Sequence, residues 1–82
     1  MKELFREKSA MRLRELRAGK KYTIEEVAEK TGVSKDTIAR YENNLVSMKI
    51  DFLAQILTAY DTNLAIFFEE IIAKTQKENE VK

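Results

Sequence analysis

Two short segments with apolar residues at helical spacing, separated by one glycine, constrain this chain most. Residues 24–43 read IEEVAEKTGVSKDTIARYEN, and Gly32 lies between the two segments. Thr23 can cap the first segment, with Glu26 three positions later completing a capping box, and Ser34 can cap the second. Glycine readily takes the left-handed conformation that a sharp turn requires. The pattern predicts two short helices joined by a tight turn.

The rest of the chain also has helical spacing, and it holds no proline and only two glycines. A first helix is expected from near the N-terminus through Ala18, with Gly19 as its stop. A fourth helix opens at Ser47 or Lys49, and Asn63 caps a fifth. We therefore expect an all-α, compact five-helix fold without strands, in which the second of the two short helices covers residues 34–42.

The length of 82 residues fits one domain. We expect residues 1–8 to extend the first helix, residues 9–74 to form the domain, and residues 75–82 to be a polar tail that frays. Phe5, Leu13 and Leu16 share the core face of the first helix, whereas Leu4 and Met11 point elsewhere.

The composition excludes several classes of function. The chain has no cysteine and no histidine, which removes the common zinc ligands, thiol nucleophiles, imidazole bases and disulfides. We expect no catalytic residues, no metal, no cofactor and no enzyme activity. The N-terminus lacks an apolar signal core, and no run approaches the ~18 apolar residues of a membrane span. A soluble, cytoplasmic protein without membrane contact is expected.

Basic charge is concentrated at one end of the chain. The formal net charge is only +1, but residues 1–21 hold eight Lys or Arg against three Glu. Such an asymmetry favours a nucleic-acid partner. A solvated helix rich in arginine would give the same pattern, so the charge supports DNA binding without establishing it.

The two short helices separate apolar from polar side chains. Ala28 is small where the helices would cross, and Val27, Val33, Ile38 and Tyr41 would fill the space beneath them. The polar side chains left facing outward are Ser34, Lys35, Asp36, Thr37 and Arg40.

With these residues the chain resembles the phage-repressor and Cro-like helix-turn-helix domains, the XRE family, from about residue 13 to residue 72. The resemblance rests on four motifs in order: Leu-x-x-Leu-Arg at Leu13, Leu16 and Arg17; Thr-x-x-Glu-x-Ala at Thr23, Glu26 and Ala28; Thr-Gly-Val-Ser at residues 31–34; and Ile-x-x-Tyr-Glu at Ile38, Tyr41 and Glu42. Each motif alone is weak, but the ordered set is specific.

The resemblance implies a lambda-repressor-like domain that binds a near-palindromic double-stranded DNA operator as a dimer, with residues 34–42 in the major groove. The positions that match base-facing residues are Lys35, Asp36 and Arg40. Those expected to face phosphates are Ile24, Ser34 and Thr37.

The chain departs from the family pattern at three positions. The family commonly has glutamine at the position of Ile24, proline at that of Met48 and glycine at that of Asp61. The first departure concerns a phosphate contact, and the other two concern turns. In the family, residues at the positions of Arg17 and Glu42 often pair, which predicts a scaffold ion pair here.

Side-chain chemistry supports the base-facing set independently. Lys35 and Arg40 can donate to O6 and N7 of guanine, whereas Asp36 can only accept, as from the amino group of cytosine. Asp36 also has a structural interpretation, because the helix dipole stabilises an acid in the first turn. For Arg40 the alternatives are a phosphate contact or a salt bridge to a nearby acid.

The last predicted helix carries more apolar surface than one core face uses. Leu64, Phe67 and Ile71 point one way, and the stripe is extended by Ala65, Phe68 and Ile72, which are the candidate dimer interface. In the alternative, Phe68 and Ile72 close over the first helix, onto Leu4 or Met11.

Two functions follow. The first is an operator-binding transcriptional regulator, either a repressor or an antitoxin with a toxin partner. The second is a protein-interaction module on the same fold with little DNA binding, which the near-neutral charge and Ile24 favour.

Overall fold

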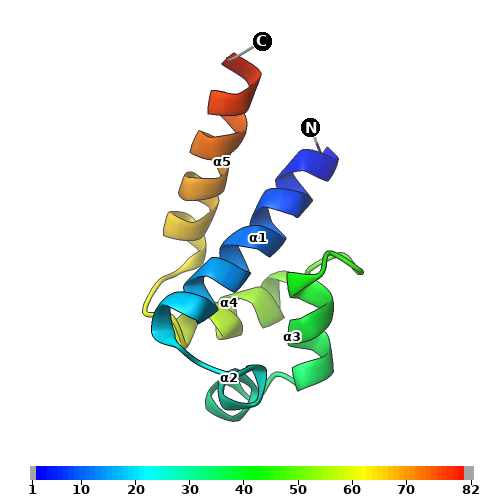
Figure 1. The fold of residues 1–82 in the computed structure, drawn as a ribbon, viewed down its shortest axis with the longest axis vertical. Helices are drawn as coiled ribbons and strands as arrows, with labels where there is room; N and C mark the ends of the chain where they lie inside the picture. The colour runs from blue at the N-terminus through cyan, green and yellow to red at the C-terminus, as the bar shows by residue number, and fades with distance from the viewer. Residues whose placement is uncertain (1, 81–82) are drawn as a thin grey trace.

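The computed structural model describes residues 2–80, with side chains from residue 4 to residue 76. These residues form five helices and no strand, so the predicted all-α, five-helix fold is confirmed. The helices are α1 (Lys2–Lys20), α2 (Ile24–Thr31), α3 (Lys35–Glu42), α4 (Ile50–Thr58) and α5 (Leu64–Glu80) (Figure 1).

The predicted caps of the two short helices are present. The Thr23 hydroxyl accepts a hydrogen bond from the Glu26 backbone N–H, and the Glu26 carboxylate accepts one from the Thr23 backbone N–H. Gly32 ends α2 at φ 77°, in the left-handed region. Ser34 caps α3 by accepting from the Thr37 backbone N–H at 3.2 Å. Local sequence therefore determines both helix starts and the turn between them.

The predicted stop at Gly19 is wrong. Helix α1 continues to Lys20, and Lys21 takes the left-handed conformation at φ 61°. The Lys21 backbone N–H donates to the Ala18 carbonyl at 3.0 Å, which satisfies an end carbonyl of the helix. Asp61 likewise adopts φ 56° at the position where the family often has glycine.

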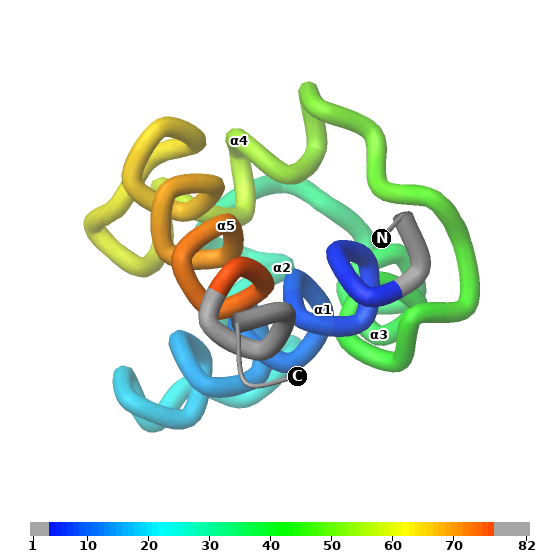
Figure 2. The backbone as a smooth tube through the Cα atoms, turned by 90° about the horizontal axis from the view of Figure 1, so that it is seen from above, coloured from blue at the N-terminus to red at the C-terminus, as the bar shows by residue number. Residues whose placement is uncertain are grey.

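Helices α1 and α5 run antiparallel and side by side, and the three shorter helices pack around the end of this pair where α1 finishes (Figure 1). Figure 2 looks along the pair and shows α1 between α5 and α3. One buried apolar cluster joins the elements: Leu13, Val27, Val33, Ile38, Tyr41, Leu53, Ile56, Leu57, Tyr60, Phe67 and Ile71. Helix α1 thus links α5 to α3.

The core face predicted for the first helix is present in α1. Phe5 and Leu16 pack partly buried against the cluster that contains Leu13. Of the two residues predicted to point away from this face, Met11 is exposed and Leu4 is half-buried. Ile50, the first residue of α4, is 55% exposed.

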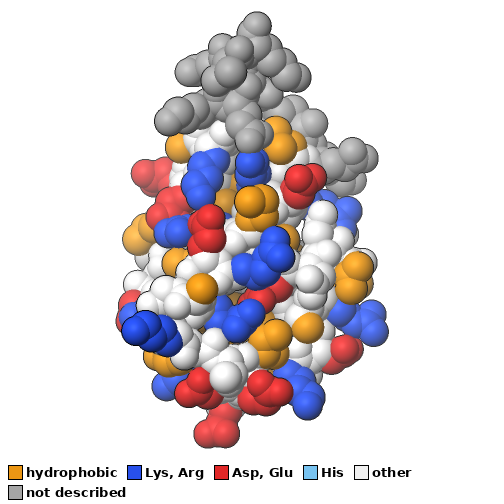
Figure 3. All heavy atoms as spheres, in the orientation of Figure 1, with side chains coloured by type: hydrophobic (Ala, Val, Ile, Leu, Met, Phe, Trp, Pro, Cys, Tyr) orange, Lys and Arg blue, Asp and Glu red, His pale blue; other side chains and the backbone are white. Residues whose placement is uncertain are grey.

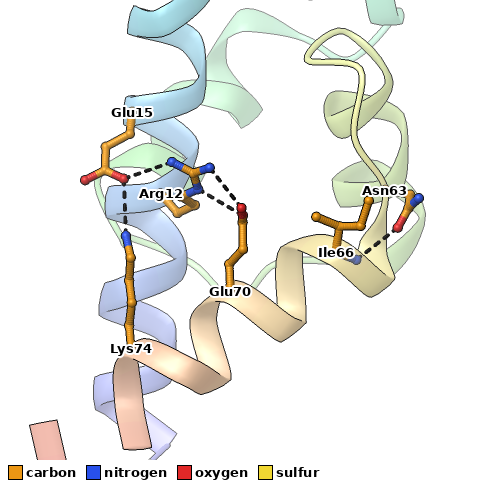
Figure 4. A network of polar contacts seen from close by, with 6 residues as sticks. All are labelled: Arg12, Glu15, Asn63, Ile66, Glu70 and Lys74. Atoms are coloured by element: carbon orange, nitrogen blue, oxygen red, sulfur yellow. Dashed lines mark hydrogen bonds and ion pairs between the residues drawn. The ribbon is translucent and has the colours of Figure 1, made fainter. Parts of the chain in front are cut away.

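A polar network ties α1 to α5 on their outer side (Figure 4). Arg12 donates from Nε and Nη2 to the two carboxylate oxygens of Glu70, both at 3.1 Å. Glu15 accepts from Arg12 at 3.3 Å and from Lys74 at 3.4 Å. Asn63 accepts from the Ile66 backbone N–H and so caps α5 as predicted. The bonds of Arg12 to Glu70 and of Lys74 to Glu15 thus join α1 to α5.

Helix α5 extends beyond the point where the sequence predicts a frayed tail. The helix runs to Glu80, and Thr75 is buried, with its hydroxyl donating to the Ile71 carbonyl at 2.9 Å. A hydroxyl that bonds back to its own helix needs no water, so Thr75 packs as a core residue. Residues 75–80 of the predicted polar tail thus belong to α5, residues 81 and 82 lie outside the described residues, and the fraying of this end stays a prediction.

Candidate nucleic-acid interface

Helix α3 is held rigidly from its inner face. Ile38 and Tyr41 are 1% and 3% exposed and belong to the apolar cluster. The Tyr41 hydroxyl accepts a hydrogen bond from the Lys49 backbone N–H at 3.0 Å. Because side chains at helical spacing share a face, burial of these two fixes which residues of α3 face outward.

The end of α3 is joined to α1 by the predicted ion pair. Arg17 Nε and Nη2 lie 2.8 Å and 2.9 Å from the two carboxylate oxygens of Glu42. A third donor, Arg17 Nη1, bonds the Tyr22 carbonyl at 3.0 Å. The Glu42 side chain is only 3% exposed and that of Arg17 is 25% exposed, so this pair is a largely buried scaffold contact that engages three of the Arg17 donors.

The three predicted base-facing residues lie together on the exposed side of α3. Lys35, Asp36 and Arg40 are all exposed. Arg40 Nε donates to Asp36 Oδ2 at 3.0 Å, one helical turn back. This is the salt bridge that the sequence offered as an alternative for Arg40, and it leaves more than half of the Arg40 side chain accessible.

Two of the predicted phosphate-facing residues are bonded to each other. Ser34 Oγ donates to Thr37 Oγ1 at 2.9 Å while it accepts from the Thr37 backbone N–H. Ser34 is exposed and Thr37 is half-buried. The hydroxyls are thus ordered at the start of α3, where the helix dipole favours an anion.

The third, Ile24, lies elsewhere and has a different environment. It packs partly buried against the apolar cluster at the first residue of α2. A shallow hollow separates the start of α2 from α3, and its walls are Arg17, Thr23, Ile24, Glu25, Lys35, Asp36 and Ala39. Ile24 therefore shapes this hollow and offers a phosphate no side-chain donor.

Sequence reasoning missed Glu25 as part of this surface. Glu25 and Glu26 stand in the first turn of α2, and Glu25 lines the hollow beside Lys35 and Asp36. Carboxylates in this place repel phosphates. The signal was present in the sequence, because both acids directly follow Ile24 at the predicted helix start.

Charges on the face shown in Figure 3 are mixed. Lys and Arg side chains spread over its middle, and acidic side chains gather at the end of the molecule where α2 lies. The basic residues of α1 are partly neutralised, since Arg12 and Arg17 pair with Glu70 and Glu42. The excess of basic residues before residue 22 therefore leaves less unpaired positive charge for DNA than the sequence implied.

The candidate dimer residues divide into two groups. Phe68 is half-buried, with its ring centroid 5.9 Å from that of Phe5 on α1. Phe68 thus closes over α1, as in the alternative interpretation, although onto Phe5 and not onto Leu4 or Met11. Ala65 and Ile72 remain exposed, as does Ile66.

Across the described residues, every helix is too short or too polar to cross a membrane. A family model described as Helix-turn-helix matches residues 13–67. The matched segment contains the capped pair α2 and α3, the Gly32 turn and the Arg17–Glu42 pair. Comparison with curated proteins and with solved structures gave no match.

Proposed function

The chain belongs to the XRE helix-turn-helix family of DNA-binding regulators, and on that premise we propose that it binds a specific double-stranded DNA operator with α3 in the major groove. In this role it controls transcription, as a repressor or as the DNA-binding half of a toxin–antitoxin pair. Lys35 and Arg40 contact base edges, and Ser34 and Thr37 contact the phosphate backbone.

The observation that carries this proposal is the division of α3 into two faces. Ile38, Tyr41 and Glu42 are committed to the scaffold, while Lys35, Asp36 and Arg40 are exposed together. A rigid helix that presents donors on its free side suits the major groove, where guanine offers the acceptors O6 and N7. The N-terminal turn of the helix, with its ordered hydroxyls, suits an adjacent phosphate.

A protein-interaction module on the same fold is the second candidate, and one observation favours it. The first turn of α2 carries Ile24, Glu25 and Glu26, which weakens phosphate contact on that side. If the chain binds DNA despite these acids, most of the contacts come from α3 and few come from α2.

The proposal includes a homodimer. Ile72 is 47% exposed on α5 and shares a helix face with the exposed Ala65, which stands two turns earlier. Neighbouring exposed apolar residues on a small domain mark an interaction surface. Two copies joined there would bring their α3 helices to half-sites about one duplex turn, ~34 Å, apart, so the operator would be near-palindromic.

Selection of bound sites from random duplexes, followed by gel-shift titration of the selected and scrambled sites at two salt concentrations, tests the function. Specific binding predicts a clear preference for one near-palindromic site. Binding to scrambled DNA should weaken steeply as salt rises, because phosphate contacts release counterions. Absence of any shift at low salt would contradict the proposal and favour the protein-interaction module.

A further inference from the structure

The ion pair between Arg40 and Asp36 lies on the surface assigned to DNA. Arg40 Nε donates to Asp36 Oδ2 at 3.0 Å, and the two side chains are 54% and 75% exposed. Within the part of the chain that the structure describes, Asp36 is the only side chain that hydrogen-bonds Arg40. A pair this exposed contributes little to stability, so its consequence lies in where it holds the guanidinium.

The contact uses one particular donor of Arg40. Guanidinium has five N–H donors in a planar fork, and Nε accounts for one. With Nε bound to Asp36, both terminal nitrogens keep their N–H groups free. Two parallel donors from Arg match O6 and N7 of a single guanine. The contact thus restrains the guanidinium and leaves free the groups that a guanine needs.

We propose that Asp36 is a positioning residue for Arg40: it holds the guanidinium so that the two terminal nitrogens read one guanine in the major groove. This role rests on the proposed function and deepens it, because it names guanine as the base that is read and Asp36 as the residue on which the preference for guanine depends. Restraining a flexible side chain before binding lowers the entropy lost on binding. Discrimination at that base pair should therefore depend on Asp36 although Asp36 need not touch the base.

The Asp36 carboxylate also has a second effect, which lowers affinity for DNA. A negative charge close to the duplex repels phosphates on any sequence. Removing Asp36 should therefore raise affinity for scrambled DNA and lower discrimination at the guanine. This combination separates positioning from simple repulsion, which would change affinity for all sequences by the same factor.

The test measures gel-shift affinity for two duplexes: the site selected by the wild-type protein, and the same site with the guanine that Arg40 reads replaced by adenine. The proteins are wild type, Asp36→Ala, Arg40→Ala and the double variant. Asp36→Asn keeps an oxygen that can accept from Nε but removes the charge. Asp51→Ala is the matched control, since Asp51 also stands in the first turn of a short helix, α4. Thermal unfolding checks that all variants fold.

Positioning predicts that Asp36→Ala lowers the preference for guanine about 3-fold or more when Arg40 is present and leaves it unchanged in the Arg40→Ala background, a coupling typical of residues in contact. Asp36→Asn should keep most of the preference, and Asp51→Ala should keep all of it.

Equal gains on both duplexes for Asp36→Ala and Asp36→Asn would overturn the inference in favour of repulsion. An equal loss of preference with and without Arg40 would overturn it as well, since Asp36 would then read a base itself. Failure of the wild-type protein to prefer any site would contradict the proposed function, and the wild-type titrations alone reveal that outcome.

Discussion

Arg17 and Glu42 join α1 to the last residue of α3 through two parallel hydrogen bonds of 2.8 Å and 2.9 Å. The Glu42 side chain is 3% exposed, whereas that of Arg17 is 25% exposed. The carboxylate is therefore almost fully removed from water, and Arg17 supplies its charge partner. Because Glu42 ends α3, the pair helps to orient the helix proposed to read DNA.

Arg17→Ala should lower the free energy of unfolding by about 3–5 kcal/mol, because it leaves a buried carboxylate without its partner. Urea unfolding measures the loss, and Arg17→Lys gives an intermediate value if the alanine variant does not fold. Arg12→Ala is the control, since Arg12 pairs with the more exposed Glu70 and should cost about 1 kcal/mol or less. Equal losses for Arg12→Ala and Arg17→Ala would contradict the buried role of the Arg17 pair.

Burial raises the pKa of the Tyr60 phenol to about 12; the nearby charge of Glu42 adds to this rise and that of Arg17 opposes it. In the unfolded chain a phenol ionises near pH 10. Between about pH 10 and pH 12 the unfolded state therefore loses a proton that the folded state keeps, and stability falls as pH rises. Below about pH 10 this loss of stability does not occur, because the phenol keeps its proton in both states.

Tyr60→Phe should remove the loss of stability that Tyr60 causes above about pH 10. At pH 11 the variant should escape a loss of roughly 1 kcal/mol that the wild type suffers relative to pH 9. At pH 7 the variant should be at least as stable as the wild type, because the buried Tyr60 hydroxyl has no hydrogen-bond partner among the described residues. Urea unfolding at the three pH values measures this, and parallel pH profiles for the two proteins would disprove the assignment.

The two glycines should respond to alanine with opposite signs. Neither position has a heavy atom within 4 Å of an added Cβ, so backbone conformation decides the outcome. Gly19 is helical, and Gly19→Ala should stabilise by about 0.5 kcal/mol. Gly32 has φ 77°, and Gly32→Ala should destabilise by about 1 kcal/mol. Thermal unfolding of both variants checks this, and a loss at Gly19 would mean that α1 ends there after all.

These glycines also indicate what could be predicted from the sequence. Gly32 follows a short, well-capped helix, so local chemistry alone determined the turn. At Gly19 the local signal was misleading, because α1 continues to Lys20 and is closed there by hydrogen bonds from the backbone of residues 21 and 22 to the carbonyls of Ala18 and Arg17. Lys20 also bonds Asp61 in the loop after α4 at 2.6 Å. A contact between residues 41 positions apart in the chain depends on how the helices pack, which one sequence does not reveal.

In the candidate site, too, some features follow from local sequence and others depend on how the helices pack. The exposed set on α3 could be derived from helical spacing, and the Asp36–Arg40 pair has the i, i+4 spacing of helix ion pairs. Two features could not be predicted. The Arg12–Glu70 pair and the Phe5–Phe68 contact depend on the crossing of α1 with α5. Because of its contact with Phe5, Phe68 is half-buried within one chain and does not lie on the expected dimer surface.

The exposed apolar residues of α5 give a direct test of the homodimer. Ile72→Glu should convert the proposed dimer to a monomer, because it places a charge in an apolar interface. It should change the stability of the monomer little, since Ile72 is 47% exposed. Phe68→Ala is the contrasting variant and should cost about 3 kcal/mol of stability through lost packing. Analytical ultracentrifugation decides the matter, and a wild-type monomer at micromolar concentration, free and on DNA, would rule out the dimer.

The central claim is that α3 reads guanine through Arg40 in the major groove. Replacing guanine by 7-deazaguanine in the selected site removes the N7 acceptor and leaves base pairing intact. We predict that this replacement weakens binding of the wild-type protein at one guanine in each half-site and has no effect on Arg40→Ala, whose own loss at the unmodified site is about 1–3 kcal/mol. Equal sensitivity of both proteins to 7-deazaguanine, or no sensitivity of the wild type at any guanine, would contradict the claim.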